Sequence, residues 1–222
     1  MEGSRRDDEA HPPDNGGDDG FSADDFPGRE ILSGSDPMKI LQRLHQDDAL
    51  ELWPRCAAHI TDQAVLLQAD RLYMRLTARL AYAAPRYRGK PPLGMWISER
   101  MEVSLRELLS DDREAERREL PTGLEQDPRY VFLSKTLGIE LGLAPRVCNR
   151  FNSLPHDQRA VFFGVMIEGR GIHGYAQDRG LPFDQVRSSL ARVIRAIGVR
   201  RDVDLSRFEW GEGILPEGGD AD

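Results

Sequence analysis

Apolar residues recur at intervals of three and four positions along most of the chain after residue 36, which is the spacing of amphipathic α-helices. No segment alternates apolar and polar residues convincingly enough to indicate a half-buried strand. We therefore predict an all-α fold. The helical patterns cover residues 40–59, 65–84, 93–109, 130–139, 143–152, 155–168, 172–179 and 182–197.

Shifts in composition divide the chain into five parts. The first part is rich in Asp, Gly and Pro and nearly free of aliphatic residues, which is typical of disorder. A run of mixed charges from Ser110 onwards extends the third helical pattern into solvent, and Pro121 and Gly123 then break it. The predicted parts are a disordered acidic tail at 1–36, a helical domain at 37–112, a helical linker at 113–150, a helix-turn-helix domain at 151–201 and a C-terminal tail at 202–222.

The last three helical patterns are separated as in a helix-turn-helix. Asn152 and Ser153 offer a small polar cap for the first helix. Gly169 and Gly171 then permit a sharp turn, and Gly180 ends a short second helix. Pro182 sets the backbone for the third helix, one face of which is apolar and faces the core. That apolar stripe consists of Val186, Leu190, Val193, Ile194 and Ile197.

The opposite face of the third helix is polar and basic. Gln and Arg can make paired hydrogen bonds to purine edges in a major groove, whereas Ser and the more distal Arg residues can hold phosphates. Residues 151–201 contain eight Arg against four Asp or Glu, so this part is net positive in an acidic chain. The residues that we expect to contact double-stranded DNA are Gln185, Arg187, Ser188, Ser189, Arg192 and Arg195.

A set of positions in this segment also carries a family pattern. These positions are Leu154, Pro155, Arg159, Val161, Phe162, Glu168, Gly169, Ala176, Gly180, Val186, Arg187, Ser188, Leu190 and Arg192. Through them the segment resembles, without a gap, the C-terminal DNA-binding region of bacterial RNA polymerase sigma factors of the extracytoplasmic-function type. The resemblance implies a sigma-like protein that recruits core RNA polymerase. It also implies that this segment docks on the upstream promoter element, with the 182–197 helix in the major groove.

Gly174 departs from that family pattern, because the family usually has an acidic helix former at this position. A glycine in a helix interior costs roughly 0.5–1 kcal/mol relative to alanine. The sequence therefore predicts a weak middle helix in the helix-turn-helix.

A basic stretch precedes the linker. Residues 71–100 contain six Arg and one Lys against the single acid Glu99. Cations and aromatic faces together hold single-stranded nucleic acid, and the stretch resembles the sigma family's passage of arginine, glycine, short loop and tryptophan helix. The residues expected to hold a melted promoter strand are Arg86, Tyr87, Arg88, Lys90 and Trp96. Since a Trp early in an amphipathic helix also suits a core, burial of Trp96 is the alternative.

The acidity of the chain comes from its first residues. Residues 1–30 contain ten acids and three Arg, a net charge of −7, whereas the whole chain has −8. The remaining part is nearly neutral, so the low pI does not argue against a nucleic-acid partner.

Other chemistry is sparse in this sequence. Cys56 and Cys148 each lie in a helical pattern, and we expect both to pack as small apolar residues without a disulfide or a metal site. The five His residues have no metal-ligand spacing and no phosphate-cradling glycine loop occurs, so we predict no enzyme, no catalytic residues and no cofactor. Without an apolar run that could act as a signal peptide or span a membrane, a cytoplasmic protein with no membrane contact is expected.

Two functions remain open at this point. The first is a sigma-factor-like initiation protein whose partners are double-stranded promoter DNA and core RNA polymerase, with an inhibitory protein partner left open. The second is a degenerate sigma-like interaction module or adaptor that does not open promoters. The second gains support from the helix before the basic stretch, where the family's acidic, glutamine-bearing segment has only faint counterparts around Gln63 and Gln68.

Overall fold

The computed structural model describes residues 30–46, 48–118, 122–199 and 203–211. These residues form α-helices joined by short 3-10 and π-helical segments, and no β-strand occurs among them, so the predicted all-α fold is confirmed. The disorder expected for residues 1–29, and the tail expected at 212–222, concern positions outside the described residues.

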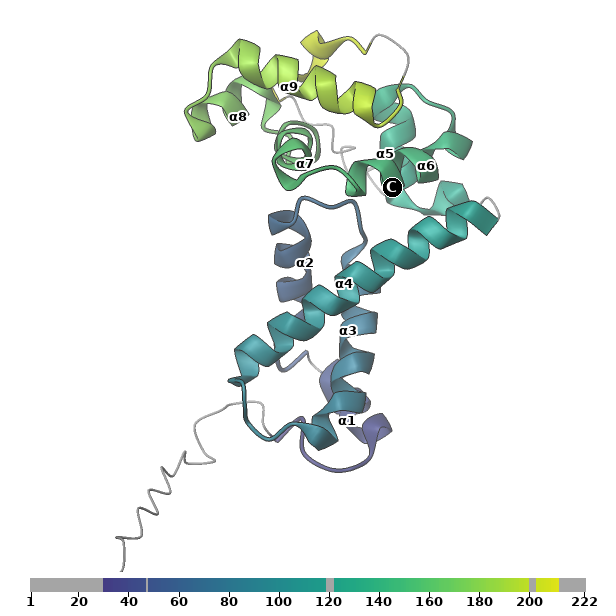
Figure 1. The fold of residues 1–222 in the computed structure, drawn as a ribbon, viewed down its shortest axis with the longest axis vertical. Coiled ribbons are helices and arrows are strands. Elements are labelled where there is room, and N and C mark those ends of the chain that lie inside the picture. The colour runs from purple at the N-terminus through teal and green to yellow at the C-terminus, as the bar shows by residue number, and fades with distance from the viewer. Residues whose placement is uncertain (1–29, 47, 119–121, 200–202, 212–222) are drawn as a thin grey trace, which may run out of the picture.

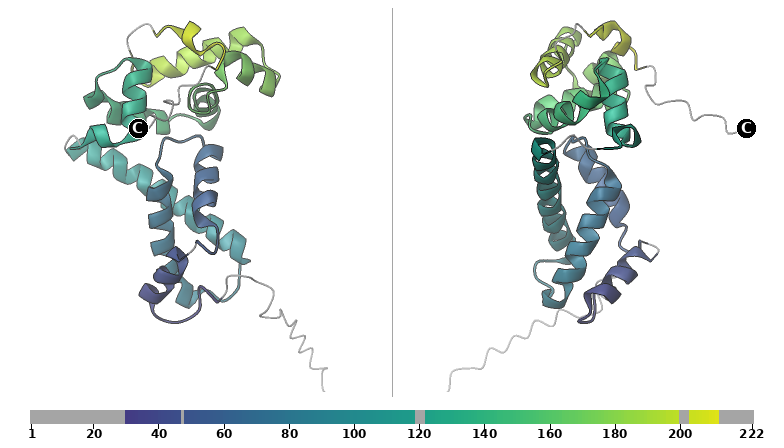
Figure 2. Two further views of the ribbon diagram at one scale, coloured as in Figure 1. Left: turned by 180° about the vertical axis from the view of Figure 1, so that it is seen from behind. Right: turned by 90° about the vertical axis from the view of Figure 1, so that its right-hand side faces the viewer.

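Two groups of helices are stacked end to end (Figure 1). The lower group consists of α1 (Pro37–His45), α2 (Leu52–Asp62), α3 (Ala69–Ala83) and the first part of α4 (Leu93–Arg118). The upper group consists of α5 (Pro128–Leu137), α6 (Ala144–Asn152), α7 (His156–Phe162), α8 (Gly171–Arg179) and α9 (Phe183–Ala196). Helix α4 reaches from the lower group to the upper one, and Figure 2 shows it along one side of the molecule. Its 26 residues correspond to a rod of about 39 Å.

Each group has its own hydrophobic core. Large side chains of the lower core include Ile40, Leu44, Leu52, Leu72, Leu76, Leu80, Ile97 and Met101. Large side chains of the upper core include Leu133, Phe151, Phe162, Met166, Ile172 and Leu190. The prediction that the cysteines pack as apolar residues is confirmed, because Cys56 lies in the lower core and Cys148 in the upper one. Burial raises the pKa of both thiols to about 12, so both are protonated at neutral pH.

The first predicted helix, over residues 40–59, is wrong as a single element. The chain leaves the helix after His45 and begins α2 at Leu52. Asp48 and Glu51 between them have positive φ angles of 43° and 51°. The Asp48 carboxylate accepts hydrogen bonds from the backbone N–H groups of Leu52 and Trp53, both at 2.9 Å. Asp48 thus caps a new helix, which a continuous apolar pattern does not reveal.

Residues 30–36 pack on α1, although the sequence places them in the tail. Leu32 is buried against the lower core, and Arg43 of α1 donates a 2.7 Å hydrogen bond to the carbonyl of Glu30. Asp36 then caps α1 by accepting from the Met38 N–H at 3.0 Å, with Pro37 in the first turn.

Leu66, in the loop between α2 and α3, connects the two groups. Its side chain is buried in the upper core, although the loop starts from the lower group. Its backbone N–H donates to the Asn152 side chain at 2.8 Å, and the Asn152 amide donates back to its carbonyl at 3.1 Å. Arg159 of α7 adds a hydrogen bond of 2.8 Å to the carbonyl of Gln63 in the same loop. The loop is therefore held by side chains of the upper group.

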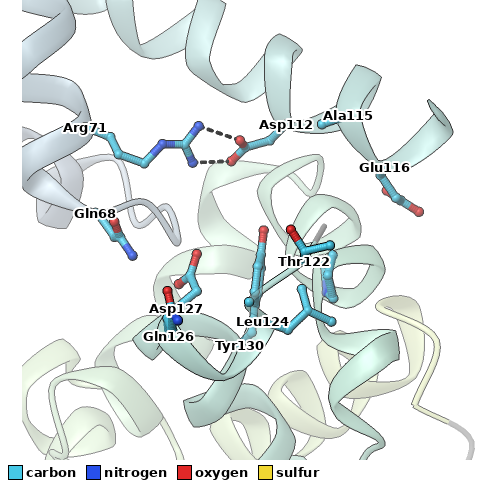
Figure 3. Close-up of a pocket in the computed structure, with 12 residues that line it drawn as sticks. Gln68, Arg71, Asp112, Ala115, Glu116, Thr122, Leu124, Gln126, Asp127 and Tyr130 are labelled. Carbon is cyan, nitrogen blue, oxygen red and sulfur yellow. Dashed lines mark hydrogen bonds and ion pairs between the residues drawn. The ribbon is translucent and has the colours of Figure 1, made fainter. Parts of the chain in front are cut away.

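Charged side chains complete this junction. Arg129 of α5 is 8% exposed and binds Asp127 at 2.6 Å and Asp112 of α4 at 3.2 Å. It also donates to the Leu66 carbonyl at 3.3 Å. Arg71 of α3 forms a two-pronged ion pair with Asp112, and Figure 3 shows the two side chains joined directly at the edge of a hollow of about 330 Å³ that Asp127 also lines. Helices α3, α4 and α5 are thereby linked through paired charges.

We predict that part of the stability is lost in acid because of Asp127. Burial opposes its ionisation, but hydrogen bonds and the charge of Arg129 outweigh burial and lower the pKa of Asp127 below its ordinary 3.8. A carboxyl group whose pKa is lower in the folded state stabilises the protein at pH values above its pKa in the unfolded chain. This stabilisation is lost as the pH falls through the folded-state pKa. Urea unfolding of the wild type and of Asp127→Asn from about pH 5 to about pH 2 measures it. A variant whose stability declines as steeply as that of the wild type would contradict the prediction.

The helices that the sequence assigns to a linker share a core with the helix-turn-helix. Leu133 and Leu137 of α5, and Val147 and Phe151 of α6, belong to the upper core together with the apolar stripe of α9. The ring of Phe151 lies 4.9 Å from that of Phe162 in α7. In the structure, α5 and α6 therefore form part of the body that supports α9.

Candidate nucleic-acid interface

Helices α7, α8 and α9 form the predicted helix-turn-helix, with one change in its first helix. Helix α7 gives way at Phe163 to a π-helical segment, η4 (Phe163–Ile167). Gly169 and Gly171 then adopt positive φ angles of 66°, as the sharp turn requires. The predicted polar cap of α7 is wrong: the Ser153 hydroxyl donates instead to the Asn149 carbonyl of the preceding helix, at 2.8 Å.

The π-helical segment brings Gly164 against the ring of Tyr175 in α8. A Cβ atom at Gly164 would lie 2.3 Å from the ring carbon Cδ2 of Tyr175, which is closer than real contacts allow. Tyr175 is itself 5% exposed and belongs to the upper core. Close approach of η4 and α8 thus depends on the absence of a side chain at position 164.

Helix α9 presents two chemically different faces. Four residues of its predicted apolar stripe, together with Ile197 just beyond its end, are buried in the upper core. The polar face is solvent-exposed at Gln185, Arg187, Ser188, Arg192 and Arg195, whereas Ser189 is half-buried. All six residues expected to contact double-stranded DNA therefore lie together on one helix.

The arginines of α9 are available for an anionic partner. Among the described residues, no carboxylate forms an ion pair with Arg187, Arg192 or Arg195. Cationic side chains that a protein does not neutralise itself are those that attract phosphates.

Two shallow hollows flank α9. One, of about 480 Å³, lies between α7, α8 and α9, and its lining includes Arg179, Gln185, Ser189 and Arg192. The other, of about 420 Å³, is lined by Arg187, Ser188, Ala191, Arg192, Arg195 and Leu205. Helix α9 therefore forms a ridge with basic side chains on both flanks.

The C-terminal segment braces the start of α9, which sequence reasoning missed. A short 3-10 turn, η5 (Leu205–Phe208), buries Phe208 in the upper core. The ring of His173 in α8 stacks on Trp210 at 4.1 Å and on Phe183, the first residue of α9, at 4.3 Å. The backbone N–H of His173 also donates to the Glu209 carbonyl at 3.1 Å. Three stacked rings thus fix the beginning of the polar ridge.

Asp204 introduces one acidic group near this ridge. Hydrogen bonds from Ser206 lower the pKa of Asp204, and smaller contributions come from the charges of Arg207 and Arg187. Its carboxylate therefore lies close enough to Arg187 to interact with it, without forming an ion pair.

The basic stretch in the lower group is partly neutralised by α4. Arg71 pairs with Asp112, Arg75 pairs with Asp111 at 2.6 Å, and Arg79 pairs with Glu107. The loop between α3 and α4 keeps its cations exposed. Three of the predicted strand-holding residues lie there, namely Arg86, Arg88 and Lys90.

Trp96 and Tyr87 pack against each other at the lower core. Their ring centroids are 4.5 Å apart, and Trp96 is 4% exposed. The Tyr87 hydroxyl donates to the carbonyl of Pro91 at 2.7 Å, which holds the loop closed over the Trp96 ring. Of the two roles considered for Trp96, the structure favours burial in the core. A buried ring does not support stacking on a DNA base.

The two candidate contact regions lie far apart in the molecule. Helix α9 is at the upper end and the loop between α3 and α4 is at the lower end (Figure 1). Most of the length of α4 runs between them.

The described residues contain no group of three or more His, Cys, Asp or Glu side chains that could hold a metal ion. Among the same residues, no helix has the length and apolar content needed to cross a bilayer.

Comparison with protein-family models, with curated proteins and with solved structures gives no match for this chain.

We predict that Gly174→Ala stabilises the protein. Gly174 lies inside α8, and a Cβ atom there would meet only the Cβ of Arg170, at an ordinary contact distance of 3.6 Å. Alanine should therefore raise the free energy of unfolding by about 0.5–1 kcal/mol, measured by urea denaturation. Gly164→Ala is the matched control, because the same added methyl group meets Tyr175 and should destabilise. A loss of stability in Gly174→Ala would contradict the geometry of α8.

Proposed function

We propose that the protein is a sigma-factor-like initiation protein that binds double-stranded promoter DNA through α9 and recruits core RNA polymerase. The observation that carries the DNA-binding part is the polar face of α9. Arg187, Arg192 and Arg195 are exposed and free of ion pairs with described residues, while the apolar stripe anchors the helix in the upper core. The polymerase-binding part rests on the family resemblance of residues 154–192.

The order of side chains along α9 suits a major groove. The major groove of B-DNA admits one α-helix, and residues near the start of the helix read base edges while later ones hold phosphates. Gln185 and Arg187 lie in the first two turns of α9, and Arg192 and Arg195 lie further along it. We assign base reading to the first pair and phosphate binding to the second.

We predict that Arg187→Ala weakens binding to the preferred DNA site by about 1–3 kcal/mol and relaxes the base preference at one position. Fluorescence anisotropy with a library of selected duplexes measures both effects. Arg192→Ala should instead weaken all duplexes alike and reduce the salt slope by about one. The control is Arg106→Ala, which removes an exposed arginine of α4 outside the α9 face. Unchanged DNA binding in Arg187→Ala would refute its assignment.

Recruitment of polymerase is tested separately. Purified protein is mixed with bacterial core RNA polymerase, passed over a size-exclusion column, and supplied with fragmented genomic DNA and nucleotides. Coelution with discrete transcript starts supports an initiation factor. DNA binding without coelution would refute the polymerase part of the proposal and leave an independent DNA-binding regulator.

An interaction module without promoter opening is the second candidate, and features of the lower group favour it. Trp96 is buried, and Arg71, Arg75 and Arg79 are paired with acids of α4, so the surface for a melted strand is reduced to one loop. The lower helices also expose large apolar side chains, at Met38, Trp53, Met74, Tyr82 and Met95. Polymerase-independent capture of a protein partner that survives high salt, together with loss of DNA binding, would favour this candidate.

A further inference from the structure

A largely apolar cavity of about 860 Å³ lies where the lower and upper groups meet. One wall comes from the end of α2 and the following loop, with Ile60, Val65 and Leu67. Opposite walls come from α5, η4 and η5, and they include Val131, Phe132, Phe163, Met166, Ile167 and Phe208. The cavity is separate from the polar face of α9, since none of its lining residues belongs to that helix.

The size and lining of the cavity suit a small molecule. Binding sites for such ligands measure about 300–1,000 Å³ and are mostly apolar with a few polar groups that fix orientation. One wall is the π-helical segment η4, and π-helical turns occur frequently at functional sites. Phe132 and Ile167 are only partly buried, so apolar side chains remain accessible from the cavity.

Of the charged side chains that line the cavity, those without an ion pair to a described residue are positive. Arg129 is engaged by Asp127 and Asp112, and Glu168 is paired with Arg170 at 2.9 Å. Lys135 and Arg207 line the cavity, are exposed, and form no ion pair with a described residue. An apolar ligand with a negative headgroup would therefore find both an apolar interior and a cation at the rim.

We propose that this cavity binds a small amphipathic carboxylate, with its apolar chain between α5 and η4 and its carboxylate at Lys135 and Arg207. Its walls come from both groups of helices, so a bound ligand stabilises the junction as well as the fold. Ligands that bind only the folded state raise its stability in proportion to the logarithm of their concentration. The proposal does not depend on DNA binding, because it uses no residue of α9.

Titration of the full chain with dodecanoate, below its micelle-forming concentration, tests the proposal by calorimetry. The expected result is saturable binding with one site and a higher melting temperature. Lys135→Glu should weaken dodecanoate by about tenfold or more, the effect of losing one charge-assisted hydrogen bond. Lys39→Glu, which makes the same charge change on an exposed lysine of α1, should leave the affinity unchanged.

A second variant and a second probe locate the site. Val131→Trp fills the cavity from α5 and should abolish binding, while circular dichroism verifies that this variant folds. Lys135 is exposed, so Lys135→Glu still decides the question if Val131→Trp does not fold.

Dodecyltrimethylammonium, which has the same chain with a positive headgroup, should bind at least tenfold more weakly than dodecanoate. Absence of dodecanoate binding, equal affinity in Lys135→Glu, or equal affinity for the cationic probe would each overturn the proposal. Arg187→Ala should bind dodecanoate like the wild type even if its DNA binding is lost.

Discussion

Replacing Arg129 with Ala is expected to lower the free energy of unfolding by about 3–5 kcal/mol, the cost of breaking a buried ion pair by removing one partner. The guanidinium is 8% exposed, and it binds two carboxylates and the Leu66 carbonyl. Its removal leaves Asp127, whose side chain is 17% exposed, without its cation. The same change removes one link between α4, α5 and the loop after α2.

Urea denaturation followed by circular dichroism measures this loss. Arg106→Ala is the matched control, because Arg106 is an exposed arginine that pairs with Glu102 one helical turn away, at 3.6 Å. Such surface pairs contribute less than about 1 kcal/mol. If Arg129→Ala cost no more than Arg106→Ala, the junction would not depend on paired buried charges. Separate unfolding transitions for the two groups of helices in Arg129→Ala would show that the junction couples them.

Trp96→Ala is expected to lower the free energy of unfolding by about 3–5 kcal/mol, the usual cost of removing a large buried aromatic side chain. The ring lies in the lower core, and its removal takes away the partner of Tyr87. The loop that carries Arg86, Arg88 and Lys90 is thereby weakened as well. Thermal and urea unfolding of Trp96→Ala provide the measurement.

Single-stranded DNA binding separates this core role from base stacking. Trp96→Leu keeps a buried apolar side chain but has no aromatic face to stack on a base, so we expect the variant to fold and to bind single-stranded DNA like the wild type. Arg88→Ala is the companion variant and should weaken strand binding, because it removes an exposed cation from the same loop. Weaker strand binding in Trp96→Leu, with stability preserved, would contradict the core role and restore the stacking role.

Helix positions were predictable where the chain carries its own signals. In α9, Pro182 precedes the helix and the apolar stripe from Val186 to Ile194 repeats at helical spacing, and the structure begins the helix at Phe183. In contrast, the break between α1 and α2 was missed because the apolar pattern continues through it. That break depends on Asp48 and Glu51 adopting left-handed backbone conformations, which are uncommon for non-glycine residues.

The candidate site also has features that the sequence predicts and features that depend on tertiary contacts. The grouping of Gln185, Arg187 and Arg192 on one face follows from helix geometry alone, since residues three and four apart share a face. Whether an arginine is free depends on what packs beside it. Arg71, Arg75 and Arg79 carry the same charge as Arg187, yet they face the acids of α4, which lie 28 to 41 positions away in the sequence.

By itself, the sequence determined the helical class, most helix positions and the polar face of α9, because helical periodicity and turn residues act over a few positions. Only the tertiary structure decided that Trp96 is buried, that Leu66 joins the two groups, that Trp210 and His173 brace α9, and that a cavity lies at the junction. These features depend on contacts between residues that are distant in the sequence. Such contacts form when apolar surfaces pack and buried polar groups find partners, and a local pattern does not specify which partners those are.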